Sequence, residues 1–145
     1  MRIRVRNVVT LGLFFILALV TVQAQTARGE VNIPFDFYAG TAKLNAGAYQ
    51  VKRMSDNAVA IRSADGKTTA LVNAPLTIGA RDSKSGRRLV FNKYGDQFFV
   101  SQIWLDVESG RQVIPSKEET RIAKDERLAN DVETPERREV ALRRW

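Results

Sequence analysis

The stretch RLVFNKYGDQFFVSQIWLD, residues 88–106, decides the fold of this chain. It predicts two strands joined at Gly95-Asp96, because a two-residue turn with glycine first is typical of a type II′ hairpin. The turn also sets the register, since each residue before it faces one residue after it. The expected cross-strand pairs are Lys93 with Phe98, Phe91 with Val100 and Leu89 with Gln102.

One face of this hairpin is strongly apolar and has to be covered by a second layer. The other face is mixed, and its side chains near the turn are candidates for contact with a partner. The apolar face is expected to hold Leu89, Phe91, Phe98, Val100 and Trp104, and the mixed face Val90, Asn92, Tyr94, Gln97, Phe99, Ser101 and Ile103. The contact candidates on the mixed face are Tyr94, Gln97 and Phe99.

Shorter strand signals precede the central hairpin. Residues 30–38 alternate between apolar and polar, which predicts a half-buried strand, and Pro34 restricts that strand to an edge or to pairing on one side. Residues 44–51 resemble a tyrosine corner, in which the Tyr49 hydroxyl hydrogen-bonds back to the preceding chain. Asp65-Gly66 predicts a second hairpin. Its expected pairs are Ile61 with Ala70 and Val59 with Val72.

A helix is expected after the strands. Ser116 followed three residues later by Glu119 fits a capping box, which predicts a C-terminal helix over 116–130. Its apolar stripe is thin, so we expect it to dock weakly. The charged segment 131–145 is expected to be poorly ordered or a loosely held helix. The predicted fold is all-β: a six- to seven-stranded antiparallel sandwich or barrel over 30–115, followed by the C-terminal α-helix.

The N-terminal segment predicts a secretory signal peptide. Residues 1–7 carry three arginines, residues 8–22 are almost wholly apolar, and small residues precede an expected cut after Ala24. We therefore expect a signal peptide over 1–24, a short linker over 25–29, and export to the periplasm or the medium. The alternative is an uncleaved membrane anchor, which would normally need about 20 apolar residues.

Composition restricts the chemistry. The chain has no cysteine and no histidine, so disulfides, thiolate metal sites and nucleophiles activated by histidine are excluded. Its net charge is +7, and after loss of three signal-peptide arginines 20 basic residues face 16 acidic ones, which leaves +4. For an exported protein this balance favours anionic envelope polysaccharide or lipid over nucleic acid as a partner. A mild positive excess is also common on soluble surfaces.

The segment RDSKSGRR, residues 81–88, predicts a polar loop that leads into the central hairpin. It is interpreted either as solvated surface or as an anion-binding patch. Its basic residues Arg81, Lys84, Arg87 and Arg88 are the candidate contacts with an anionic partner.

Carboxyl groups are the remaining candidates for catalysis. A glycosidase needs two of them roughly 5–10 Å apart, one with a raised pKa. The aspartates here fall mostly in turns and loops, where they serve local backbone hydrogen bonds, so we expect no catalytic residue. We also expect no metal and no cofactor, because Lys67 and Lys84 stand where a calcium loop needs further acids. The aspartates are Asp36, Asp56, Asp65, Asp82, Asp96 and Asp106.

Several segments, taken as a set, resemble an uncharacterised family of small exported bacterial proteins. They are GEVNIPFDFYAG, KLNAGAYQV, AIRSADGK and LVFNKYGDQFFVSQIW, followed by a charged helix that opens at PSKEE, and they cover roughly residues 30–129. The resemblance implies export and a β-rich fold, and it implies no catalytic residue. Asn45 departs from the proline expected in that family, which makes this turn less rigid.

The sequence thus predicts an exported, non-catalytic β module that binds a partner or associates with the cell envelope. A carboxylate-based enzyme acting on glycans and a membrane-anchored envelope protein are the two alternatives. The identity of the ligand and the oligomeric state are left open by the sequence.

Overall fold

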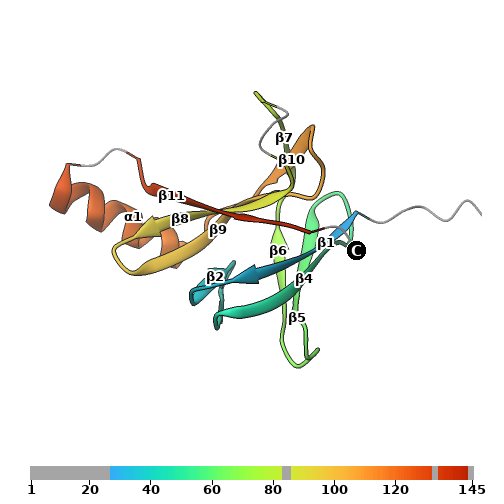
Figure 1. Ribbon diagram of the computed structural model, residues 1–145. Coiled ribbons are helices and arrows are strands. Elements are labelled where there is room, and N and C mark those ends of the chain that lie inside the picture. The colour runs from blue at the N-terminus through green and yellow to red at the C-terminus, as the bar shows by residue number, and fades with distance from the viewer. Residues whose placement is uncertain (1–26, 83–85, 132–133, 144–145) are drawn as a thin grey trace, which may run out of the picture.

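The computed structural model describes residues 27–82, 86–131 and 134–143. The predicted signal peptide lies outside the described residues. The described chain forms two antiparallel sheets and one C-terminal helix, which confirms the expected all-β class and gives a sandwich rather than one closed barrel (Figure 1). No helix in the described ranges is long and apolar enough to span a membrane.

The structure has eleven strands within these ranges, more than the six or seven expected. The four-stranded sheet has the order β1-β4-β5-β6, and the larger sheet has the order β11-β8-β9-β10-β7 with β2 beside β9 and β3 beside β2. The elements are β1 (Arg28–Ile33), β2 (Phe37–Ala39), β3 (Ala42–Leu44), β4 (Gly47–Arg53), β5 (Ala58–Ser63), β6 (Thr69–Asn73), β7 (Leu76–Gly79), β8 (Arg88–Tyr94), β9 (Gln97–Trp104), β10 (Ser109–Gln112), α1 (Lys117–Asn130) and β11 (Glu136–Ala141).

The central hairpin is confirmed as β8 and β9, joined at Gly95-Asp96. Gly95 has a φ of 56°, the left-handed value that the first position of this turn requires. The pairs nearest the turn are those expected, Lys93 with Phe98 and Phe91 with Val100.

Farther from the turn the predicted register was wrong by one residue. A bulge after Val100 makes Ser101 an extra residue, so Gln102 pairs with Val90 and Ile103 with Leu89. The extra residue exchanges the two faces beyond it. Ile103 therefore joins the core between the sheets, whereas Trp104 lies outside that core on the outer face of the larger sheet.

The second hairpin and the tyrosine corner are confirmed. β5 and β6 pair Ile61 with Ala70 and Val59 with Val72, and Gly66 in the turn has a φ of 74°. The Tyr49 hydroxyl donates to the Asn45 carbonyl at 2.6 Å. These contacts fix the register of the four-stranded sheet against the shared core.

The first predicted strand is divided at Pro34. β1 ends at Ile33 and is the edge strand of the four-stranded sheet, as expected: it pairs along its length with β4, and its other side carries one bridge, from Glu30 to Arg143. After Pro34 the chain enters the other sheet as β2. The boundary predicted for the linker was wrong at its end, because Arg28 and Gly29 already belong to β1.

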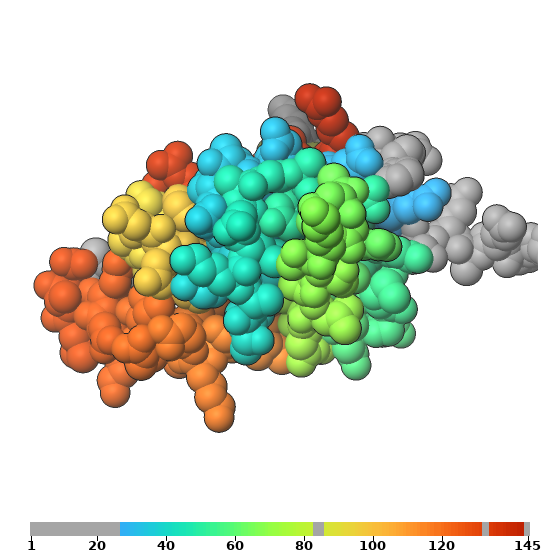
Figure 2. Space-filling model, turned by 90° about the horizontal axis from the view of Figure 1, so that it is seen from below, coloured from blue at the N-terminus to red at the C-terminus, as the bar shows by residue number. Residues whose placement is uncertain are grey.

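The helix begins where the capping signal predicts. Ser116 Oγ accepts a hydrogen bond from the Glu119 backbone N–H at 3.1 Å, and the helix runs to Asn130. It lies beside the end of the β8–β9 hairpin, away from the four-stranded sheet (Figure 1). In Figure 2 the orange helix protrudes at one end of the molecule beside the yellow segment of the β8–β9 hairpin, and blue to green segments fill the centre of that face.

The prediction of a poorly ordered tail was wrong for the described residues after the helix. Residues 136–141 form β11, which pairs along the whole of its length with β8. Arg143 then exchanges two backbone hydrogen bonds with Glu30 of β1, at 2.8 and 2.9 Å, and Leu142 is buried in the core. The tail therefore joins the two sheets along one side of the sandwich.

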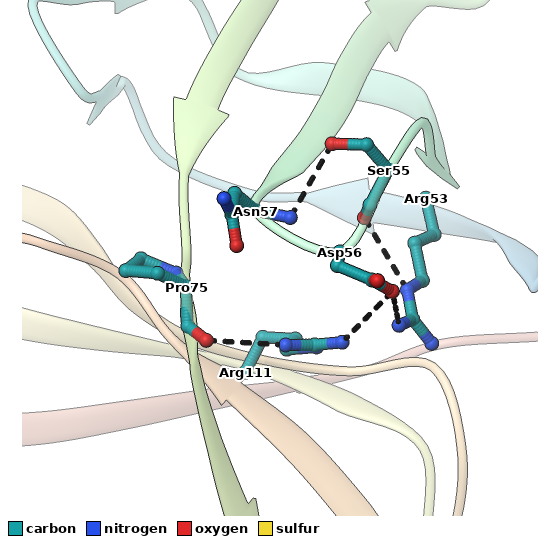
Figure 3. Close-up of polar contacts among 6 residues, drawn as sticks. All are labelled: Arg53, Ser55, Asp56, Asn57, Pro75 and Arg111. Atoms are coloured by element: carbon teal, nitrogen blue, oxygen red, sulfur yellow. Dashed lines mark hydrogen bonds and ion pairs between the residues drawn. The ribbon is translucent and has the colours of Figure 1, made fainter.

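The other side of the sandwich is joined by polar contacts around Asp56, in the turn between β4 and β5 (Figure 3). Arg53 donates to the Asp56 carboxylate at 2.7 Å, and Arg111 of β10 lies 3.8 Å from it. Arg111 also donates to the Pro75 carbonyl at 3.3 Å. Because Asp56 is 91% exposed, these ion pairs orient the turn and add little stability.

Candidate functional site: an arginine pocket

An open pocket of about 610 Å³ lies on the outer face of the larger sheet, away from the core. Three arginines reach it from separate parts of the chain: Arg81 follows β7, Arg88 opens β8, and Arg137 lies on β11. We call it the arginine pocket. Its lining residues are Ile78, Gly79, Arg81, Asp82, Arg88, Gln102, Trp104 and Arg137.

The floor of the arginine pocket is a stack of three residues. Arg88 and Trp104 are cross-strand partners, and the guanidinium carbon lies 4.4 Å from the centre of the indole ring. Below the ring is Gly110 of β10, where a Cβ atom would come within 2.5 Å of the indole. Trp104 lies flat on the sheet because Gly110 has no side chain there.

The Arg88 guanidinium is held by several groups. One terminal nitrogen donates to the Gly86 carbonyl at 2.9 Å, and Nε lies 3.5 Å from the Glu139 carboxylate of β11. Its side chain is only 12% exposed, and buried Nε makes no geometrically sound hydrogen bond. Arg88 is therefore a fixed cation whose charge Glu139 partly compensates.

Arg81 and Arg137 are exposed and frame the pocket at its rim. Within the described part of the chain neither has a carboxylate partner. Asp82 is the one acid that lines the pocket. The three guanidinium groups outnumber the lining carboxylate of Asp82 and the Glu139 carboxylate beside Arg88, so the surface keeps a positive excess that attracts anions and offers them N–H donors.

The structure brings together only part of the predicted basic loop. Arg81 and Arg88 both line the arginine pocket, whereas Arg87 is half-buried beside it and is not among the lining residues. Lys84 lies outside the described residues.

The hairpin end contributes less surface than expected. Tyr94 is 8% exposed and Phe99 is 2% exposed, and the Phe99 ring stacks on Tyr38 at 4.7 Å between centroids. Burial leaves little of either side chain for contact with a partner, although Tyr94 borders the smaller pocket between α1 and β8. Gln97 is exposed, but it lies near the turn and does not line the arginine pocket.

A second, smaller pocket of about 410 Å³ lies between α1 and β8. Glu119 borders it and is 4% exposed, and its carboxylate accepts hydrogen bonds from Asn92 at 3.0 Å and from Tyr94 at 3.4 Å. Burial raises the pKa of Glu119, although both hydrogen bonds act in the opposite direction. Burial and the nearby Glu119 charge raise the pKa of Tyr94 to about 12. The Glu119 carboxyl thus attaches α1 to the sheet.

The aspartates of the turns serve local structure. Asp36 accepts from the Ala46 backbone N–H at 2.8 Å, and Asp106 accepts from that of Glu108 at 2.9 Å. Asp65 accepts from the Ser63 hydroxyl and the Lys67 backbone N–H, which hold the pKa of this carboxyl below its ordinary value. With its pKa lowered, the Asp65 carboxyl stays ionised at neutral pH and is a poor general acid. No set of three potential metal ligands occurs in the described ranges.

Sequence reasoning missed Arg137 and assigned Trp104 to the core. Arg137 was placed in a poorly ordered tail, and only the pairing of β11 with β8 carries it to the pocket. The signal for Trp104 was Gly110, because a glycine in a strand often marks the close approach of another group.

No protein-family model, no curated protein and no solved structure matches this chain. The resemblance to a family of small exported proteins therefore stays a prediction, and the function has to be inferred from the site.

Proposed function

We propose that this protein is an exported, non-catalytic module that binds anionic groups of envelope polysaccharide or lipid through the arginine pocket. The observation that carries the proposal is the convergence of Arg81, Arg88 and Arg137 from three separate elements on one open pocket. Guanidinium groups keep their charge at every physiological pH and pair with phosphate and carboxylate oxygens. The chain has no histidine, the side chain that most often serves as a general acid or base near neutral pH, which favours binding over acid–base catalysis.

The proposal is tested by co-sedimentation of the purified protein across a salt series. The ligands are lipopolysaccharide, polygalacturonate and vesicles of phosphatidylcholine with phosphatidylglycerol, and the neutral counterparts are dextran and pure phosphatidylcholine vesicles. We expect binding to the anionic ligands that weakens as salt rises, because salt screens exposed charges over about 10 Å at 0.1 M.

A charge-matched pair of variants distinguishes the pocket from general positive charge. The double variant R81Q/R137Q removes two cations from the pocket rim. The control R62Q/R138Q removes two exposed cations elsewhere, since Arg62 lies on β5 and Arg138 is the neighbour of Arg137 that pairs with core residue Phe91. Loss of binding in R81Q/R137Q alone supports the proposal. Equal loss in both, or no binding to any anionic ligand, contradicts it.

A further inference from the structure

We infer, resting on the function proposed above, that the arginine pocket recognises a phosphate monoester through its charge and shape alone. The sugar, glycerol or other carrier of that phosphate stays outside the site. Three features of the pocket lead to this ligand class: the closed faces of its aromatic ring, the use of its neutral polar groups within the protein, and the separate elements that supply its arginines.

Trp104, the one aromatic residue among the described residues that line the pocket, has no free face. Trp104 carries the Arg88 guanidinium 4.4 Å from its centre on one side, and the Gly110 backbone closes the other side. The residue is 4% exposed. A sugar ring or a base needs an open aromatic face for stacking, so the pocket lacks the platform that ring recognition uses.

The neutral polar groups are also committed within the protein. The Trp104 indole N–H donates to Gln102 Oε1 at 3.1 Å, and Gln102 Nε2 donates to Gln112 Oε1 at 3.2 Å. Sugar hydroxyls are usually bound by such neutral polar side chains, which both donate and accept hydrogen bonds. The groups left to meet a ligand are charged N–H donors, which select for an acceptor with negative charge.

The positions of the cations favour phosphate over carboxylate. A carboxylate is planar and is satisfied by one guanidinium in a two-pronged contact, whereas a phosphate monoester has three terminal oxygens and up to two charges. Arg137 reaches the pocket from β11, Arg81 from the segment after β7, and Arg88 from the floor. Cations supplied by three separate elements can contact more than one terminal oxygen of a phosphate, whereas one guanidinium is enough for a carboxylate. One aspartate, Asp82, faces them.

A phosphate monoester occurs on phosphorylated glycans, on lipid headgroups and as free small molecules. The terminal phosphate group that the pocket would bind is the same in each. The probes are therefore glycerol 1-phosphate and inorganic phosphate, with galacturonate and acetate as carboxylate probes and glycerol as the neutral probe. Binding is measured by isothermal titration calorimetry at low salt. The same compounds are then used as competitors in co-sedimentation with phosphatidic acid vesicles and with a phosphorylated mannan.

We expect both phosphate probes to bind at least about tenfold more tightly than the carboxylate probes, because each additional charge-assisted hydrogen bond contributes that much or more. R81Q/R137Q should lose at least about tenfold in phosphate affinity, and R62Q/R138Q should keep it. Circular dichroism of both variants verifies that they fold, which exposed arginines on the surface should allow.

The outcomes separate this inference from the function it rests on. Carboxylate probes that bind as tightly as phosphate probes would overturn the preference for phosphate and leave anion binding intact. Anionic polymers that bind while phosphate alone neither binds nor competes would show that the carrier is read as well. Failure of every anionic polymer to bind would overturn the proposed function itself. Competition on vesicles only, or on mannan only, identifies which source of phosphate the protein meets.

Discussion

The close packing of the Trp104 indole on Gly110 can be tested by adding one methyl group at residue 110. In Gly110→Ala the new Cβ would lie 2.5 to 2.8 Å from three atoms of the indole. The ring cannot move aside without displacing the Arg88 guanidinium stacked on its other face. Overpacking of this kind costs about 1–3 kcal/mol, and loss of the cation–π contact adds about 0.5–1 kcal/mol. We expect the free energy of unfolding to fall by about 1.5–4 kcal/mol.

A matched control lies on the neighbouring strand. Gly79 of β7 pairs with Ser109, the residue before Gly110, and a Cβ on Gly79 would meet no atom within 4 Å. Gly79→Ala should therefore leave the free energy of unfolding unchanged or raise it by up to about 1 kcal/mol, because alanine lowers the conformational entropy of the unfolded chain.

Urea unfolding followed by far-ultraviolet circular dichroism is the suitable assay, because tryptophan fluorescence would respond directly to movement of the indole. With an m-value of about 1–3 kcal/mol/M, Gly110→Ala should lower the midpoint by about 1 M relative to the wild type. Equal midpoints for the two alanine variants would show that the Trp104 indole does not pack closely on Gly110. The indole would then have a free face, and the exclusion of sugar stacking at the arginine pocket would fail with it.

Three further predictions concern the core, the corner and the helix. Phe91 is fully buried against the edges of Phe35 and Phe37, so Phe91→Ala should cost about 3–5 kcal/mol in urea unfolding; an unchanged midpoint would mean that the hairpin faces are reversed. Tyr49→Phe removes the hydrogen bond to Asn45 and should cost about 0.5–1.5 kcal/mol, with a melt that shows no loss arguing against the corner. Burial raises the pKa of Glu119 above its ordinary 4.5, so the stability it contributes is complete below that pH and is lost as the pH rises through the raised pKa. Wild type should therefore lose stability relative to Glu119→Gln between pH 4 and pH 7, and a constant difference between the two across that range would contradict the raised pKa.

Local features of the fold were predictable from the sequence because short segments encode them. Turn chemistry at Gly95-Asp96 and Asp65-Gly66 fixed two hairpins, and Ser116 fixed the start of the helix. Each of these signals acts within a few residues, so no knowledge of distant chain was needed. Two of the three arginines of the pocket were also predictable, since Arg81 and Arg88 stood out in a basic cluster beside a strand.

The tertiary structure alone decided the rest of the site. The bulge at Ser101 adds one residue, and with a side-chain period of two this moved Trp104 from the core to the outer face. β11 has no alternating pattern, because an edge strand is held by backbone hydrogen bonds to β8 that any side chain permits. The outer position of Trp104 and the position of β11 both depend on residues elsewhere in the chain: Gly110 lies beneath the indole, and β8 pairs with the tail. The sequence by itself therefore determined the strands, the turns and the supply of cations, and only tertiary pairing brought Arg137 and Trp104 to Arg88.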